Sequence, residues 1–310
     1  MYGRDGSWVV VVCTLAAACT SACGVIRHGA VSGLPQPGAS GELETYIEQV
    51  RHLSVSAAPP LPSSETLESR DGHLREALKA LQASPTADAH LRVAALYRRA
   101  GVLDQAFGHY QAAATIDRQS AAAYEGLART WRDWGRPDLG LADAWRAVYY
   151  APDSPEALNT YGTLLMALGR PDDAARTFSR VTELAPRASY GWTNRCYVAF
   201  ERGALDESVG FCRRALALTP ELTDARNDLA LAYAAGGDLT SALAEFERGG
   251  DEASGQYNLG IVLLAARQFA PAAEAFERAS MLRPGWSAAQ VRAAQAHRHV
   301  VALATGTQEP

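Results

Sequence analysis

The chain has 310 residues and a formal net charge of −5, from 29 lysines and arginines against 34 aspartates and glutamates. Because it carries no basic excess, the chain as a whole lacks the electrostatic signature of a nucleic-acid-binding protein. Apolar residues make up 48% of the sequence and charged residues 20%, a composition that agrees with a compact exported protein.

The amino-terminal segment predicts export. Arg4 lies in a short polar stretch, and an apolar run follows over residues 8–18. This run has about half of the length that a membrane-spanning helix requires. We therefore interpret residues 1–18 as a secretory signal peptide.

A cysteine directly after this segment indicates how the mature protein is anchored. The sequence Leu15-Ala16-Ala17-Ala18-Cys19 resembles a bacterial lipobox, with its leucine one place further upstream than usual. The resemblance implies a lipid on Cys19, with Cys23 as a second candidate, and Thr20 implies the outer membrane. The alternative is an ordinary signal peptide that is cut after an alanine.

Residues 19–70 predict a flexible tether before the first folded helix. The stretches 29–41 and 54–64 are rich in glycine, proline, serine and alanine. Between them, apolar residues at helical spacing predict a short amphipathic helix over 41–54 (Leu43, Tyr46, Ile47, Val50 and Leu53). Asp71 then predicts an N-cap for a helix within 71–86 that closes the end of the following array.

From residue 87 onward, the chain repeats itself every 34 residues. The period is set by Gly101, Gly135, Gly169, Gly203 and Gly237, and the same interval separates Pro152, Pro186 and Pro220. Each glycine suits a tight turn between helices, where a left-handed backbone is expected. A strict period of this length with helical composition predicts a stacked array of helix–turn–helix units.

Within each repeat, small and large residues recur at fixed places. Ala174 and Phe178 follow Gly169 by five and nine residues, so that a small residue and an aromatic residue share one face of the second helix. The first helix pairs a large apolar residue with a small one, as at Tyr161 and Gly162. These residues resemble the tetratricopeptide repeat consensus.

The resemblance implies an all-α, right-handed α-solenoid of about six helix–turn–helix units. We expect the array to span 87–286, with units at 87–120, 121–154, 155–188, 189–222, 223–252 and 253–286. The fifth unit is short because its second helix breaks at residues 249–251. A capping helix over 287–302 and a tail over 303–310 complete the expected organisation.

In this family the concave face of the array is lined by fixed positions of the first helices, and the resemblance transfers these positions to particular residues. They are Arg98, Arg129, Arg132, Asn159, Thr163, Asn194, Tyr197, Phe200, Asn227, Tyr257 and Asn258. One end is rich in arginine and the other in amides and aromatics, which suit contact with a peptide. The alternative is that these are ordinary exposed positions, with the arginines paired to Glu125 and Asp133.

Cys196 and Cys212 fall on the facing sides of the two helices of one repeat. In an oxidising compartment, a disulfide between them is geometrically conceivable. The alternative, which we favour, is a pair of buried free cysteines that act as small hydrophobes.

The sequence contains no phosphate-cradling glycine loop, HExxH motif, CxxC pair or GxSxG elbow. We therefore expect no catalytic residue, no metal site and no cofactor. The expected protein is a non-catalytic adaptor that binds a peptide or protein in the concave groove and does not bind nucleic acid.

The lipid anchor implies a location at a bacterial membrane, facing the periplasm, as a monomer or a component of a larger complex. Exported repeat lipoproteins of this layout resemble the pilus-assembly class, which implies a role in assembling a pilus or a secretion machine. The alternative is an accessory subunit of an envelope enzyme complex in cell-wall or polysaccharide metabolism.

Overall fold

The structure, a computed structural model, describes residues 64–305, and every element within this range is an α-helix. The predicted signal peptide, Cys19 and the predicted helix over 41–54 lie outside the described residues. The chain divides between Leu184 and Ala185 into two compact units. Their described parts are called the first unit (64–184) and the second unit (185–305).

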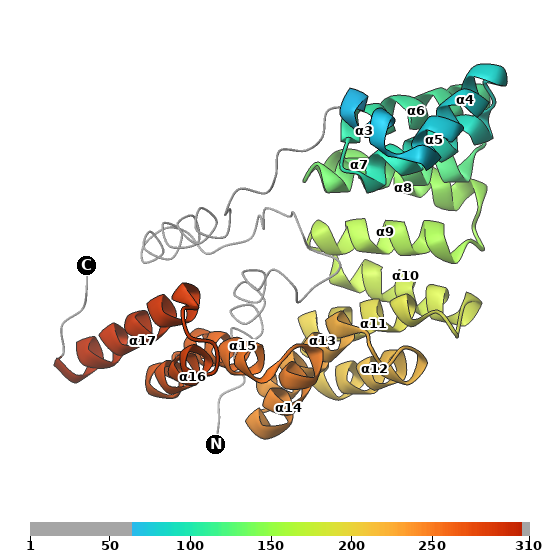
Figure 1. Cartoon of the computed structure of the whole chain (residues 1–310). Coiled ribbons are helices and arrows are strands. Elements are labelled where there is room, and N and C mark those ends of the chain that lie inside the picture. The colour runs from blue at the N-terminus through green and yellow to red at the C-terminus, as the bar shows by residue number, and fades with distance from the viewer. Residues whose placement is uncertain (1–63, 306–310) are drawn as a thin grey trace. The chain divides into compact units, whose positions relative to one another are not determined.

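The described part of the first unit contains eight helices: α3 (Ser64–Arg70), α4 (Gly72–Ala83), α5 (Ala87–Arg99), α6 (Leu103–Ile116), α7 (Ala121–Asp133), α8 (Pro137–Tyr150), α9 (Pro155–Ala167) and α10 (Pro171–Leu184). The described part of the second unit contains seven: α11 (Ser189–Glu201), α12 (Leu205–Leu218), α13 (Thr223–Ala235), α14 (Leu239–Gly249), α15 (Glu252–Ala265), α16 (Phe269–Leu282) and α17 (Ser287–Thr305). Within each unit, every helix packs against the next one along the chain (Figure 1). The predicted all-α solenoid of stacked helix pairs is confirmed.

The repeating glycines lie where the backbone enters the left-handed region. The φ angle is 80° at Gly101, 68° at Gly169 and 86° at Gly237. A side chain in this conformation crowds the following carbonyl oxygen and costs about 1–2 kcal/mol, whereas glycine has no Cβ. The sixth repeat departs from the rule, because Arg267 adopts a φ of 57° at the same turn.

The first and second helices of a repeat approach each other most closely where a glycine faces a phenylalanine. A Cβ added to Gly162 would lie 2.6 Å from Cε1 of Phe178, and one added to Gly260 would lie 2.7 Å from Cε1 of Phe276. Both phenylalanines are fully buried. The small residue of the repeat pattern therefore makes room for the aromatic ring of the partner helix.

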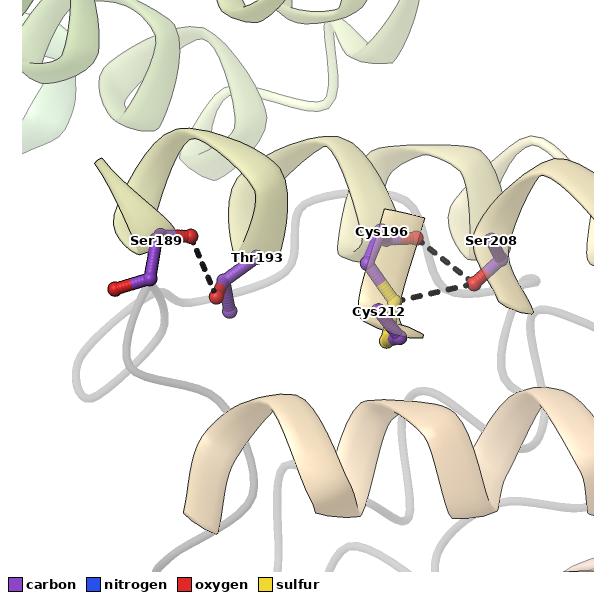
Figure 2. Close-up of a disulfide and its surroundings, with 5 residues drawn as sticks. All are labelled: Ser189, Thr193, Cys196, Ser208 and Cys212. Atoms are coloured by element: carbon purple, nitrogen blue, oxygen red, sulfur yellow. Dashed lines mark hydrogen bonds between the residues drawn. A yellow bond between two sulfur atoms is a disulfide. The ribbon is translucent and has the colours of Figure 1, made fainter. Parts of the chain in front are cut away.

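A disulfide takes the place of this contact in the fourth repeat. Cys196 on α11 and Cys212 on α12 are bonded, with their Cα atoms 5.1 Å apart, and both residues are fully buried (Figure 2). The hydroxyl of Ser208 donates a hydrogen bond of 3.0 Å to the carbonyl oxygen of Cys196. The structure therefore contains a disulfide at this place, and not the pair of free cysteines that we favoured from the sequence. Close approach of the two helices brings the Cα atoms within the usual span of a disulfide.

Helical structure begins before the predicted boundary of the tether. Residues 64–70 form α3, although the sequence predicted a tether through residue 70. Leu67 packs on the apolar cluster of the first unit, and the hydroxyl of Tyr97 donates a hydrogen bond of 2.6 Å to Glu68. Asp71 caps α4 by accepting hydrogen bonds from the backbone N–H groups of His73 and Leu74. Contacts with α5 thus hold α3 and α4 at the start of the array.

The second unit contains both a shortened helix and a covering helix. Helix α14 has 11 residues, whereas α12 has 14, and Asp251 caps α15 two residues after α14 ends. Helix α17 extends to Thr305, three residues beyond the predicted end at 302. Its Ala293 and Ala296 are buried in the same cluster as Phe276, so α17 covers the apolar face of the last repeat.

Alanine substitutions at two glycines test the close helix contact. We expect Gly162→Ala to lower the free energy of unfolding by about 1–3 kcal/mol, because the new Cβ overpacks against Phe178. Gly108 on α6 is the control, since a Cβ there meets no atom within 4 Å. Gly108→Ala should instead raise the stability by about 0.5–1 kcal/mol through its better helix propensity. Urea denaturation followed by circular dichroism measures both, and equal midpoints would contradict the assignment.

Candidate functional site

The arginine end of the predicted groove is assembled in the first unit. Arg98 on α5 and Arg132 on α7 both pair with Asp133, at 2.8 Å from Nη1 of Arg98 and 3.1 Å from Nη2 of Arg132. Nη1 of Arg132 also lies 3.4 Å from the hydroxyl oxygen of Thr163 on α9. Polar contacts therefore connect the first helices of three successive repeats.

Glu125 on α7 makes a second connection on this surface. Its Oε1 lies 3.3 Å from Nη1 of Arg129 and accepts a hydrogen bond of 3.0 Å from Thr160 on α9. Asn159, next to Thr160, is half-buried. The arginine network is the name used below for Arg98, Glu125, Arg129, Arg132, Asp133, Thr160 and Thr163. The pairing of the arginines with Glu125 and Asp133, which belongs to the alternative interpretation of these positions, is present in it.

The arginine network has more positive than negative charge. It contains three guanidinium groups and two carboxylates. Burial lowers the pKa of Arg132, and the neighbouring charges of Arg129 and Arg98 lower it further, against the opposing effect of Asp133. The Nε atoms of Arg98 and Arg129 are buried and have no hydrogen-bond partner among the described residues. The part of the network that a partner can reach is the side chain of Arg129, which is 40% exposed, whereas those of Arg98 and Arg132 are 22% and 24% exposed.

The amide and aromatic end of the predicted groove is not an open surface. Asn194, Tyr197 and Asn227 are buried, with exposed fractions of 6%, 5% and 4%. Phe200 is only 1% exposed, so the prediction that it lines the groove is wrong. Its ring belongs to a core cluster of the second unit, because the helices of the next repeats cover it with Leu231 and other apolar side chains.

Tyr257 also takes part in packing between helices. Its ring stacks on Trp286 with centroids 4.6 Å apart and meets Phe276 edge-on at 5.4 Å. Asn258, the next residue, is half-buried. The groove positions that the family resemblance assigned are therefore less exposed in the second unit than in the first.

Sequence reasoning missed an exposed aromatic cluster on α8. Trp145 and Tyr149 are 54% and 65% exposed, and their rings stack with centroids 5.3 Å apart. Tyr150 meets Tyr149 edge-on. Exposed apolar clusters mark surfaces of interaction. The sequence signal for this cluster was the spacing of Trp145 and Tyr149, which are four residues apart on the second helix of a repeat. The predicted groove positions, in contrast, are all on first helices.

Between residues 64 and 305, no group of three or more histidine, cysteine, aspartate or glutamate side chains is arranged to hold a metal ion. Within the same part of the chain, no helix has both the length and the apolar character needed to cross a membrane.

Comparison with known families matches a tetratricopeptide repeat model to residues 159–223, which include α11 and α12. This chain carries the tetratricopeptide repeat within residues 159–223. Sequence comparison with curated proteins gives no match.

Solved tetratricopeptide repeat structures share the fold at low sequence identity. PilF from Pseudomonas aeruginosa is 19% identical, with a TM-score of 0.54 over 72% of this chain and 99% of PilF. PilW, a widely conserved type IV pilus biogenesis factor, is 20% identical, with a TM-score of 0.58 over 66% of this chain and 97% of PilW. A tetratricopeptide repeat protein from Parabacteroides merdae is 19% identical, with a TM-score of 0.54 over 72% of this chain and 91% of its own. At these identities, the likeness shows the fold alone.

Removing one carboxylate tests whether the arginine network is an electrostatic unit. We expect Asp133→Asn to lower the free energy of unfolding by about 1–3 kcal/mol, because Arg98 and Arg132 lose their shared counter-charge. The loss should grow at low salt, where repulsion between the arginines is less screened. Asp138→Asn is the control, since Asp138 pairs with Arg136 on the open surface in the first turn of α8, and its loss should change the midpoint much less. Thermal unfolding at two salt concentrations measures both, and identical shifts would show that Asp133 has no special role.

Proposed function

We propose that this protein is a non-catalytic adaptor that binds a peptide segment or protein on the surface formed by α5, α7 and α9. The arginine network carries the proposal, because it combines an excess of positive charge with a guanidinium group, that of Arg129, on a side chain that is 40% exposed. Stacked repeats of this kind form extended binding surfaces. Arginine suits such a surface because its planar group recognises oxygen acceptors in a fixed geometry.

The proposed ligand supplies oxygen atoms along an extended chain. Backbone carbonyls or acidic side chains would accept hydrogen bonds from the exposed guanidinium group of Arg129, while Thr160 and Thr163 remain bound within the network. The network fixes the arginine side chains before binding, so the ligand need not immobilise them again.

The proposed location is the bacterial envelope, with the protein held at the periplasmic side of the outer membrane by a lipid on Cys19. The apolar run over 8–18 and the lipobox-like sequence before Cys19 support it. The disulfide between Cys196 and Cys212 supports it independently, because disulfides persist mainly in oxidising compartments. A role in assembling a pilus or secretion machine agrees with the fold shared with PilF and PilW.

Affinity capture tests the binding surface. The Arg98→Gln, Arg129→Gln double variant should recover at least tenfold less of its partner from native membranes than the unmodified protein, which corresponds to about 1.4 kcal/mol or more. Arg136→Gln, at an arginine that is 55% exposed and pairs only locally, is the matched control. Quantitative mass spectrometry measures recovery, and circular dichroism confirms that helicity is retained. Equal recovery of the partner by a folded double variant would contradict binding at this surface.

Intact-mass analysis of protein from its native host tests the proposed location. We expect a mature chain that begins at Cys19 with added acyl mass. Cys196 and Cys212 should resist alkylation in denaturant until a reductant is added, because a disulfide contains no free thiol. An unlipidated chain, or alkylation of these cysteines without reduction, would contradict the export and anchoring that we propose.

A further inference from the structure

An open cleft in the second unit lies among α12, α13 and α14. Its volume is about 550 Å³, within the range of about 300–1,000 Å³ that is usual for ligand sites. Arg213, Arg226 and Arg248 contribute to its wall together with Glu245, and the half-buried Leu216 contributes an apolar surface. None of these residues belongs to the arginine network.

The cleft coincides with two irregularities of the fifth repeat. Arg226 stands 11 residues before the turn glycine Gly237, where the second, third and fourth repeats have Tyr124, Leu158 and Trp192. Helix α14 is also shorter than α12 and ends directly after Arg248. A polar residue thus replaces a large apolar one beside a helix that stops about one turn early.

The charges in the cleft are unbalanced. Glu245 pairs with Arg226 at 3.1 Å and also with Arg248, while Arg213 donates a hydrogen bond of 2.6 Å to the hydroxyl of Tyr233. Three guanidinium groups therefore face one carboxylate. Arg213 and Arg248 are exposed, whereas the side chains of Arg226 and Glu245 are only 19% and 12% exposed. Buried Glu245 holds Arg226 and Arg248 in place, and Nη2 of Arg226 also donates a hydrogen bond of 2.7 Å to the carbonyl oxygen of Pro220. The exposed Arg213 and Arg248 are therefore the arginines that a ligand can reach.

We propose that this cleft binds an acidic, partly apolar peptide segment of a partner protein. Carboxylates of the segment would pair with Arg213 and Arg248, and a neighbouring aliphatic side chain would lie against the half-buried Leu216. Charge-assisted bonds from arginine to carboxylate are strong and directional. A peptide fits better than a nucleic acid because the whole chain is acidic, with a formal net charge of −5.

This site is separate from the surface in the proposed function. Arg226, Leu229 and Tyr233 are on the face of α13 that turns toward α12 and α14, whereas the predicted groove position on α13 is Asn227. The two surfaces are also in different units. The adaptor would therefore have a second contact site, and ligand binding there would not depend on the arginine network.

Fluorescence anisotropy with a defined probe tests the site. The probe is a fluorescein-labelled peptide of four Glu-Leu repeats, added to the purified full chain, with a Gln-Leu peptide as the uncharged counterpart. The Arg213→Gln, Arg248→Gln variant retains the buried pair of Arg226 and Glu245, and we expect it to bind the acidic probe at least tenfold more weakly. Binding to the unmodified chain should weaken as salt rises.

Two further variants serve as controls. Arg136→Gln, Arg146→Gln removes the same charge from arginines that are 55% and 52% exposed outside the cleft, and it should bind the probe within twofold of the unmodified chain. The Arg98→Gln, Arg129→Gln variant should do the same, which separates this site from the arginine network.

Four results would overturn the proposal. They are equal affinity for the Gln-Leu peptide, undiminished binding by a folded cleft variant, loss of binding in the arginine-network variant instead, and displacement of the probe by inorganic phosphate at equimolar concentration.

Discussion

The whole array depends on the close contact between the two helices of each repeat. In the third and sixth repeats a glycine of the first helix receives a phenylalanine ring of the second, at Gly162 with Phe178 and Gly260 with Phe276. Steric fit at this point sets the rotation of both helices, and rotation decides which side chains face inward. The fourth repeat keeps the same approach by a covalent bond between Cys196 and Cys212.

Departures from the repeat pattern produce the features that distinguish this chain. A polar Arg226 at an apolar position and a shortened α14 accompany the basic cleft of the second unit. In the first unit, the regular repeats bring Asp133 between Arg98 and Arg132, so that one carboxylate offsets two positive charges. Regular packing builds the scaffold, while the local exceptions give parts of its surface their own chemistry.

The two arginine-rich sites use partly buried carboxylates in the same way. A guanidinium group that is removed from water loses solvation, and a nearby carboxylate offsets that loss while fixing the side chain. Glu125 and Asp133 do this in the arginine network, and Glu245 does it in the cleft. In both sites the arginines outnumber the carboxylates, so each surface keeps a net positive charge that can attract an acidic ligand. The chain as a whole, in contrast, is acidic.

The sequence alone was sufficient to predict the helical repeats and their turns, and it offered the arginine–acid pairing as an alternative, because these features depend largely on short-range rules. A left-handed turn favours glycine at a fixed interval, as at Gly169, and oppositely charged side chains four apart on one helix, such as Glu125 and Arg129, are neighbours. Only the tertiary structure decided that Phe200 is core, that α3 folds onto the array, and that Cys196 and Cys212 are joined. Each of these depends on which neighbouring helix covers a residue and at what distance, and a periodic pattern in one chain does not contain that information.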